Sequence, residues 1–230
     1  MTRRARTPGV LERERAEGPA AGGGDAGDPP SSGQAMYFYG VTRARGWRPI
    51  TLGRTDEDDV TRVRYRDLEA LVRPTLYEVP PLDDAHVQAH QRAVEAAMRR
   101  GTVLPAPYGI VFRGRRQLIR MLQDQYLVLD EGLSFLEGHW ELRLHLTAAE
   151  PRPELLELAT HVYTELRRFA RAAVPFPHDE NRLLSAGFLV ERGSWLEFMH
   201  RAEDMGSAHP ELAFDITGPW PPYDFVRIAG

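Results

Sequence analysis

The chain has 230 residues, of which 42% are hydrophobic, so it is long enough to bury one large core or two smaller ones. Its formal net charge of -4 excludes a net positive field that would draw it onto nucleic acid or an anionic membrane. The absence of cysteine excludes disulfides, thiolate nucleophiles and cysteine-based metal sites. No segment approaches the roughly 18 apolar residues of a membrane span, and no apolar stretch follows the basic start, so we expect a cytoplasmic protein.

The first 35 residues combine arginine and glutamate with runs of glycine, proline and serine. Such a composition buries too little apolar surface to offset the entropy of ordering, so we predict a disordered tail over residues 1–35. The aromatic and β-branched run that starts at Met36 predicts a strand to about Thr42. A second strand is predicted over residues 68–72, before Pro74.

Three patterns follow in the first half of the chain. Residues 83–100 have the signals of a helix, with an aspartate cap at the start and Gly101 after the end. The prolines within residues 103–112 remove backbone donors and predict an edge strand or a rigid loop. Apolar residues at three- and four-residue spacing then predict one long amphipathic helix over residues 114–137, whose stripe consists of Leu118, Leu122, Tyr126, Leu129, Leu133 and Leu136.

Strands and helices alternate in the remainder of the chain. Residues 139–146 have a period of two, which predicts a strand with Trp140 and the leucines inward and with His139, Glu141, Arg143 and His145 outward. A helix begins near Pro153, and its predicted inner face ends at Phe169. The next predicted elements are a buried strand, a helix and a strand, over residues 183–190, 194–205 and 212–218.

This order is close to a ferredoxin-like unit but is one strand short of the usual four, so we predict a modified βαβαβ unit. The whole chain is therefore predicted to be an α+β protein of two domains. Their bounds are residues 36–137 and 138–230, and the long amphipathic helix joins them.

Two groups of polar residues have the composition of a metal or catalytic site. His86 and His90 share one face of the first helix, but no third ligand accompanies them, which favours a solvated helix face. The adjacent residues His178 to Asn181 combine base, acid and amide groups, and a polar turn explains them more simply than proton transfer does. Neither a phosphate-binding glycine loop nor a serine nucleophile motif is present, so we expect no cofactor and no enzymatic activity.

A basic run occupies the start of the long helix and consists of Arg113, Arg115, Arg116 and Arg120. Arginine at this end opposes the helix macrodipole, so we expect a carboxylate of a partner to compensate it. A solvated helix face and an anion or RNA site are the alternatives.

The run from Thr217 to Phe225 contains three prolines and three aromatic residues. The prolines stiffen the backbone, so the aromatic rings are presented at low entropic cost. One interpretation is a clip in which Trp220 packs the last strand onto its own domain. The other is an outward contact surface, and the candidate partner-binding residues are therefore Trp220, Pro221, Pro222, Tyr223 and Phe225, together with Arg113, Arg115 and Arg116.

The sequence GPWPPY at residues 218–223, followed by an aromatic residue, resembles the terminal signature of the GvpF/GvpL family of gas vesicle accessory proteins. Other segments are similar to the family in the same order: MYFYGV at 36–41, VLPAPYGIVF at 103–112, LEGHWELRLHL at 136–146 and LLSAGFLV at 183–190. The resemblance implies two α+β domains, the second a modified ferredoxin-like unit. It also implies contacts with the major shell protein and with other accessory proteins during vesicle biogenesis, without known catalysis.

We therefore predict a cytoplasmic assembly factor, associated with the gas vesicle, that binds the major gas vesicle shell protein and other gas vesicle accessory proteins. The alternative hypothesis is a ferredoxin-like regulatory module that binds a small ligand between helix and sheet. A hydrolase built on residues 178–181 is a third hypothesis. Self-association through an exposed sheet edge is a further open alternative.

Overall fold

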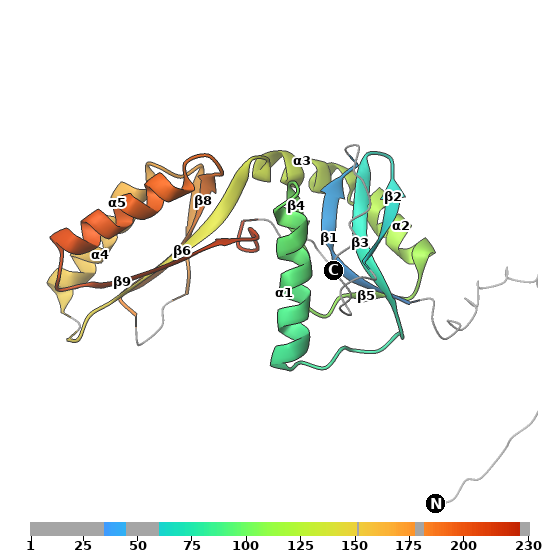
Figure 1. The fold of residues 1–230 in the computed structure, drawn as a ribbon, viewed down its shortest axis with the longest axis horizontal. Coiled ribbons are helices and arrows are strands. Elements are labelled where there is room, and N and C mark those ends of the chain that lie inside the picture. Colours follow the sequence, from blue (N-terminus) through green and yellow to red (C-terminus); the bar gives the residue numbers. More distant parts are fainter. Residues whose placement is uncertain (1–34, 45–59, 151, 178–181, 226–230) are drawn as a thin grey trace, which may run out of the picture.

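The structure, a computed structural model, describes residues 35–44, 60–150, 152–177 and 182–225. These residues form two antiparallel sheets at opposite ends of an elongated molecule, with helices packed on each sheet (Figure 1). The chain therefore combines α and β structure, as predicted. The predicted disordered tail lies outside the described residues except for Ala35, which begins the first strand.

The first sheet is built around its longest strand, β1. Its strand order is β2-β3-β1-β4, and β5 also pairs with β1; the bounds are β1 Ala35–Arg43, β2 Thr61–Tyr65, β3 Leu68–Thr75, β4 Val103–Pro105 and β5 Val111–Phe112. β4 lies at an edge, in agreement with its proline content. The pairing with β3 shifts at Gly40, where φ is 148° and a Cβ atom would lie 2.5 Å from the carbonyl oxygen of Leu104. Only glycine allows β1 and β4 to approach this closely.

Helices cover both faces of the first sheet. Successive residues of β1 point to opposite faces, so Tyr37 packs against α1 (Asp84–Met98), whereas Phe38 joins the core beneath α2 (Arg115–Asp124) and α3 (Tyr126–Leu136). Asp83 caps α1 as predicted, because its carboxylate accepts a 3.0 Å hydrogen bond from the amide of His86.

The predicted long helix over residues 114–137 is two helices, α2 and α3, with a break at Gln125. The backbone of Gln125 has φ -103° and ψ 13°, and its amide still bonds the carbonyl oxygen of Met121. Directly after the break, the hydroxyl of Tyr126 donates a 2.7 Å hydrogen bond to Asp67 in the β2–β3 turn. This anchor holds α3 to the sheet, and the leucines of both helices enter one core.

The second sheet has the strand order β7-β8-β6-β9 within the described residues, so it has four strands and not the predicted three. The bounds are β6 His139–Thr147, β7 Ala172–Pro175, β8 Leu184–Glu191 and β9 Ala213–Trp220. One face packs against α4 (Pro153–Arg167) and α5 (Trp195–Ala208). Phe169 lies beyond the end of α4 and is 47% exposed, so its predicted inward position is wrong.

Candidate interaction surface

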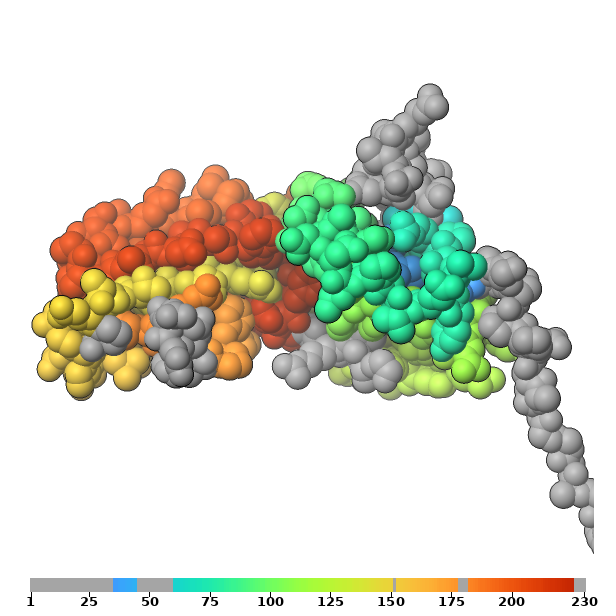
Figure 2. Space-filling model, turned by 90° about the horizontal axis from the view of Figure 1, so that it is seen from below, coloured from blue at the N-terminus to red at the C-terminus, as the bar shows by residue number. Residues whose placement is uncertain are grey.

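The C-terminal run lies between the two sheets. Pro221 and Pro222 are buried, and Trp220, Tyr223 and Phe225 are partly buried. Tyr223 packs against the core between β1 and α1, and Phe225 packs against the core beneath α2 and α3. Figure 2 shows this C-terminal part of the chain, in red, between the two ends of the molecule. We call residues 220–225 the wedge. Its two prolines are buried, so they do not form the outward surface that was one of the two interpretations of the sequence.

Trp220 begins the wedge on the edge of its own sheet. Its indole N–H donates a 3.0 Å hydrogen bond to the hydroxyl of Thr217, and the residue pairs with Glu141 on β6. The nearby Gly218 has φ 128°, and a Cβ atom there would lie 2.9 Å from the carbonyl oxygen of Glu141. Trp220 is thus held against its own sheet, as the clip interpretation requires.

Three polar side chains, those of Glu141, Arg143 and Asp224, connect the wedge to β6. The Nε atom of Arg143 contacts the carboxylate of Glu141, and its Nη2 atom lies 2.8 Å from Asp224 Oδ2. The backbone amide of Asp224 donates a 3.2 Å hydrogen bond to the other oxygen of Glu141. The chain therefore closes a network between two segments that are far apart in the sequence.

Glu141 is fully buried, although the alternation of β6 predicted an outward position. The prediction was wrong because the wedge covers this face of the strand. Burial raises the pKa of Glu141 to about 8; the contact with Asp224 acts in the same direction, and the charge of Arg143 acts against it. No local signal in the sequence marks this burial, because it depends on a contact with Asp224.

His86 and His90 do not share a metal site. Nε2 of His90 lies 3.1 Å from the carbonyl oxygen of Ala106, and Nδ1 lies 2.8 Å from the hydroxyl oxygen of Tyr37. Because a carbonyl only accepts, Nε2 carries the proton and the Tyr37 hydroxyl donates to Nδ1, which defines a neutral imidazole. His90 is buried, so the predicted solvated position is wrong for it, whereas His86 is exposed and contacts Asp83.

The part of the chain that the structure describes contains no group of three histidine, aspartate or glutamate residues that could hold a metal ion. The other predicted polar group, His178 to Asn181, lies outside the described residues.

Replacing His90 by glutamine is expected to remove part of the loss of folding stability at acidic pH. Burial lowers the pKa of His90, so the unfolded chain binds a proton more readily than the folded chain. The stability contributed by the neutral imidazole is complete above about pH 6.5 and is lost below it, by at most about 1.4 kcal/mol per pH unit. Chemical unfolding of both proteins between about pH 5 and pH 7.5 measures the difference. Parallel pH profiles for the two proteins would contradict the expectation.

The predicted basic residues Arg113, Arg115 and Arg116 are exposed at the start of α2. The N-cap residue, Gly114, makes no side-chain hydrogen bond, and the first turn contains no acidic residue. The positive end of the helix dipole and the three guanidinium groups therefore add to one local positive potential. We call residues 113–116 the basic turn.

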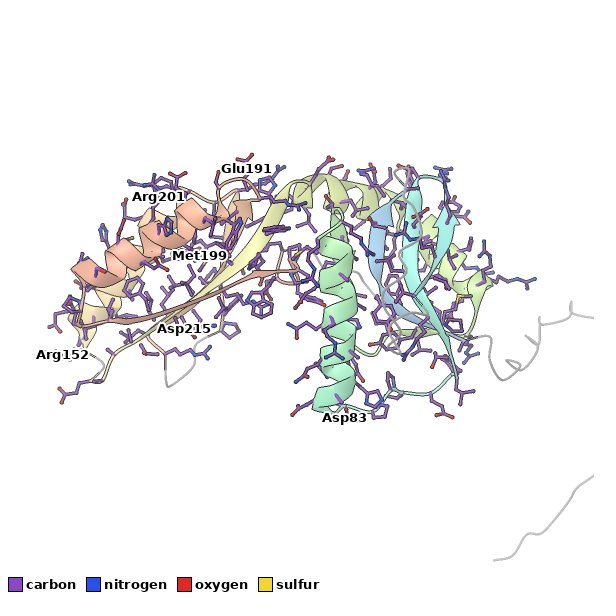
Figure 3. The ribbon with its side chains drawn as sticks, in the orientation of Figure 1. Asp83, Arg152, Glu191, Met199, Arg201 and Asp215 are labelled. Atoms are coloured by element: carbon purple, nitrogen blue, oxygen red, sulfur yellow. The ribbon has the colours of Figure 1, made fainter. Side chains whose placement is uncertain are left out.

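The loop between β3 and α1 exposes an apolar segment, residues 76–82, which was not among the predicted sites. Val79 is 92% exposed and Leu82 is 84% exposed, and Leu76 and Tyr77 are about half exposed. The hydroxyl of Tyr108 donates a hydrogen bond to the carbonyl oxygen of Pro81. The segment runs from β3 past one end of the strands of the first sheet (Figure 1) and leads to Asp83, labelled in Figure 3. Its sequence, LYEVPPL, was a visible signal, since four large apolar residues occur there without a strand or helix period.

The apolar segment and the basic turn meet through one contact. The guanidinium carbon of Arg113 lies 5.2 Å from the ring centroid of Tyr77, within the range of a cation–π interaction. Together they form an apolar–basic surface. Clustered exposed apolar side chains of this kind are typical of sites that bind another protein.

The fold and this surface define a mixed α and β protein with two antiparallel sheets and an exposed apolar–basic surface on the first of them. No helix in the described ranges has the length and apolar character needed to cross a membrane. The family model for the gas vesicle synthesis proteins GvpL/GvpF matches residues 35–157 and 147–227. The chain belongs to the GvpL/GvpF family, as its sequence motifs indicated, and this membership supports a role in gas vesicle formation.

Relatives with known names agree with this assignment. Gas vesicle protein F1 of Halobacterium salinarum is 26% identical over 206 residues, which cover 84% of this chain and 93% of the relative. Gas vesicle protein L of Streptomyces sp. (strain CB03234) is 24% identical over an alignment 256 positions long, gaps included, that covers 86% of this chain and 95% of the relative.

Two solved structures share the fold. The crystal structure of GvpF from Anabaena sp. PCC7120 superposes with a TM-score of 0.74 at 20% identity, and covers 87% of this chain and 98% of that protein. The crystal structure of GvpF from Microcystis aeruginosa superposes with a TM-score of 0.69 at 14% identity, and covers 83% of this chain and 98% of that protein. The arrangement of both sheets is therefore that of known GvpF structures.

Proposed function

We propose that this chain is an accessory protein of gas vesicle assembly that acts by binding other gas vesicle proteins, without catalysis. Its partners are the major gas vesicle shell protein and other gas vesicle accessory proteins, which it binds in the cytoplasm at the forming vesicle. Family membership supports the setting, and the apolar–basic surface supports the mode of action.

The apolar segment is the observation that carries the proposal. Val79 and Leu82 extend almost completely into solvent, although full burial of each side chain would contribute about 1.5–3 kcal/mol. Two prolines, Pro80 and Pro81, stiffen the backbone between them, so little entropy is lost when a partner covers the segment. An apolar shell subunit is a partner of matching chemistry.

The basic turn adds selectivity to this contact. A carboxylate of the shell subunit or of another accessory protein would compensate the guanidinium groups of Arg113, Arg115 and Arg116 at the start of α2. Charges at the rim of an interface act mainly on association rate and salt dependence. We therefore expect association to weaken as salt is added, while the apolar segment supplies most of the affinity.

The positions of the groups with strongly perturbed pKa values support a role without catalysis. Burial raises the pKa values of Tyr37 and Tyr223 and that of Glu141. Tyr37 and Tyr223 pack in the core between β1 and α1, and Glu141 lies beneath the wedge. Their perturbation follows from structural burial, and the surface proposed for binding uses none of them.

We also propose that the second half of the chain is a ferredoxin-like domain that begins at Gly138. The element order β6-α4-β7-β8-α5-β9 and the sheet order β7-β8-β6-β9 both follow the split βαβ pattern. The strand β7 is the fourth strand, which the sequence pattern did not predict.

Co-purification with co-expressed major gas vesicle shell protein tests the proposal. The double variant Val79→Ser, Leu82→Ser is expected to recover about tenfold less shell protein, because it removes apolar area from two side chains that are almost completely exposed. The matched control is Leu156→Ser, Leu196→Ser, since these leucines on α4 and α5 are 50% and 54% exposed. Equal recovery with the test and control variants would count against this surface, and no recovery with any form of the chain would count against the proposed function.

A further inference from the structure

A cavity of about 410 Å³ lies where the two halves of the molecule meet, and it shares no residue with the apolar–basic surface. Its walls in the first half come from the end of α1, from β1 and from the end of α3, and include Met98, Leu133 and Leu136. Trp140 and Pro222 close it from the second half. Its volume falls within the range of about 300–1,000 Å³ that is typical of small-molecule sites.

The charged groups of the lining are mostly cationic. Four guanidinium groups border the cavity, those of Arg43, Arg62, Arg100 and Arg192, against one carboxylate, that of Glu137. Two of the four are neutralised by ion pairs, because Arg43 contacts Asp67 and Asp130, and Arg62 lies 2.6 Å from Glu69. Within the described residues, Arg100 and Arg192 contact no carboxylate.

Arg100 and Arg192 reach the cavity from opposite halves. Arg192 follows β8 and lies over the indole of Trp140, with its guanidinium carbon 4.8 Å from the ring centroid. Its Nη2 atom lies 3.5 Å from the carbonyl oxygen of Arg99, the neighbour of Arg100 at the end of α1. Arg100 and Arg192 therefore border one space whose other walls include the apolar side chains of Met98, Leu133 and Leu136.

Electrostatics within the first half favour an anion in this space. Desolvation lowers the pKa of Arg100, and the charge of Arg99 adds to this effect. Desolvation also lowers the pKa of Arg62, against the opposing effect of Glu69, and repulsion from Arg100 contributes. Near the end of α1 the carbonyl oxygens of Glu95 and Ala97 accept hydrogen bonds from the backbone amides of residues 99–101.

We propose that this cavity binds an amphiphilic organic anion of the aliphatic monocarboxylate class. Its head group lies between Arg100 and Arg192, and its apolar body lies against Met98, Leu133 and Leu136. Because the walls come from both halves, a bound anion bridges them and stabilises the folded chain by mass action. This site goes beyond the proposed binding of shell protein and does not depend on it.

Decanoate, below its micelle concentration, is the probe. It is expected to raise the midpoint of thermal unfolding of the full chain and to displace the fluorescent anion 8-anilinonaphthalene-1-sulfonate. Decan-1-ol and decyltrimethylammonium have the same chain without the negative charge, and each is expected to bind about tenfold more weakly. Equal binding of decanoate and of either analogue would overturn the assignment of an anion site.

Variants locate the site. The double variant Arg100→Gln, Arg192→Gln is expected to weaken decanoate binding about tenfold, whereas Arg152→Gln, an exposed arginine at the start of α4 (Figure 3), leaves it unchanged. Ala97→Phe fills the cavity and is expected to abolish binding with both arginines in place. Undiminished binding by both the double variant and Ala97→Phe, or loss of binding in the Val79→Ser, Leu82→Ser variant, would place the anion elsewhere and refute the proposal.

Discussion

Replacing Tyr223 and Phe225 together by alanine is expected to lower the free energy of unfolding by about 4–6 kcal/mol. The two rings follow the last strand of the second sheet, but they pack against the two different cores of the first sheet. Truncation of a buried aromatic side chain costs about 3–5 kcal/mol, and a partly buried ring costs less, about 2–3 kcal/mol. Chemical denaturation monitored by circular dichroism measures the loss.

The wedge predicts a second signature in the same experiment. If Tyr223 and Phe225 couple the two halves, the double variant is expected to unfold in two transitions where the parent unfolds in one. The control is Phe169→Ala, because this ring is 47% exposed, and its loss is expected to cost less than about 1 kcal/mol. A double variant with a single transition and parental stability would show that the wedge does not hold the halves together.

Local patterns predicted the elements whose sequence signal is long or capped. The Asp83 cap, the apolar face of α1 and the leucines of β6 all follow from spacing within one element, and the structure has them. The strand β7 was missed because its four residues, AAVP, do not alternate. The strand β2, TRVRY, alternates apolar and polar residues, so its signal was present in the sequence. The break at Gln125 was missed because the leucine spacing continues through it, while the anchor that holds α3 is the distant Asp67.

The candidate surface was predicted in part. The position of Arg113, Arg115 and Arg116 at a helix start follows from the sequence, and their exposure follows from their charge. The wedge could not be predicted, because a stiff aromatic run has the same sequence whether it faces solvent or a second sheet. The burial of Glu141 and His90 likewise depends on partners more than ten residues away, Asp224 for Glu141 and Tyr37 for His90.

Because of the network beneath the wedge, the free energy of unfolding is expected to fall as the pH rises toward 8. The pKa of Glu141 is raised from 4.5 to about 8 in the folded chain, so the folded state binds this proton more tightly than the unfolded state. The resulting stability is complete below about pH 4.5 and is lost progressively as the pH rises to about 8, by at most about 1.4 kcal/mol per pH unit. Titration of His90 changes the stability in the opposite direction and only below about pH 6.5. The interval from about pH 6.5 to 8 therefore separates the effect of Glu141 from that of His90.

The variant Glu141→Gln tests this expectation, because glutamine keeps the size of the side chain and an oxygen that accepts from the Asp224 amide. Over that interval the parent is expected to lose on the order of 2 kcal/mol relative to the variant. Arg143 and Tyr223 do not produce the slope, because their pKa values are raised and lie above this interval. Desolvation opposes the rise for Arg143, but Glu141 and Asp224 outweigh it, and burial raises the pKa of Tyr223. Urea unfolding at several pH values measures the difference, and a slope that persists in Glu141→Gln would assign it to another group. If the slope disappears, protonated Glu141 is one of the groups that stabilise the packing of the wedge against β6. The contact between the two halves then weakens under mildly alkaline conditions.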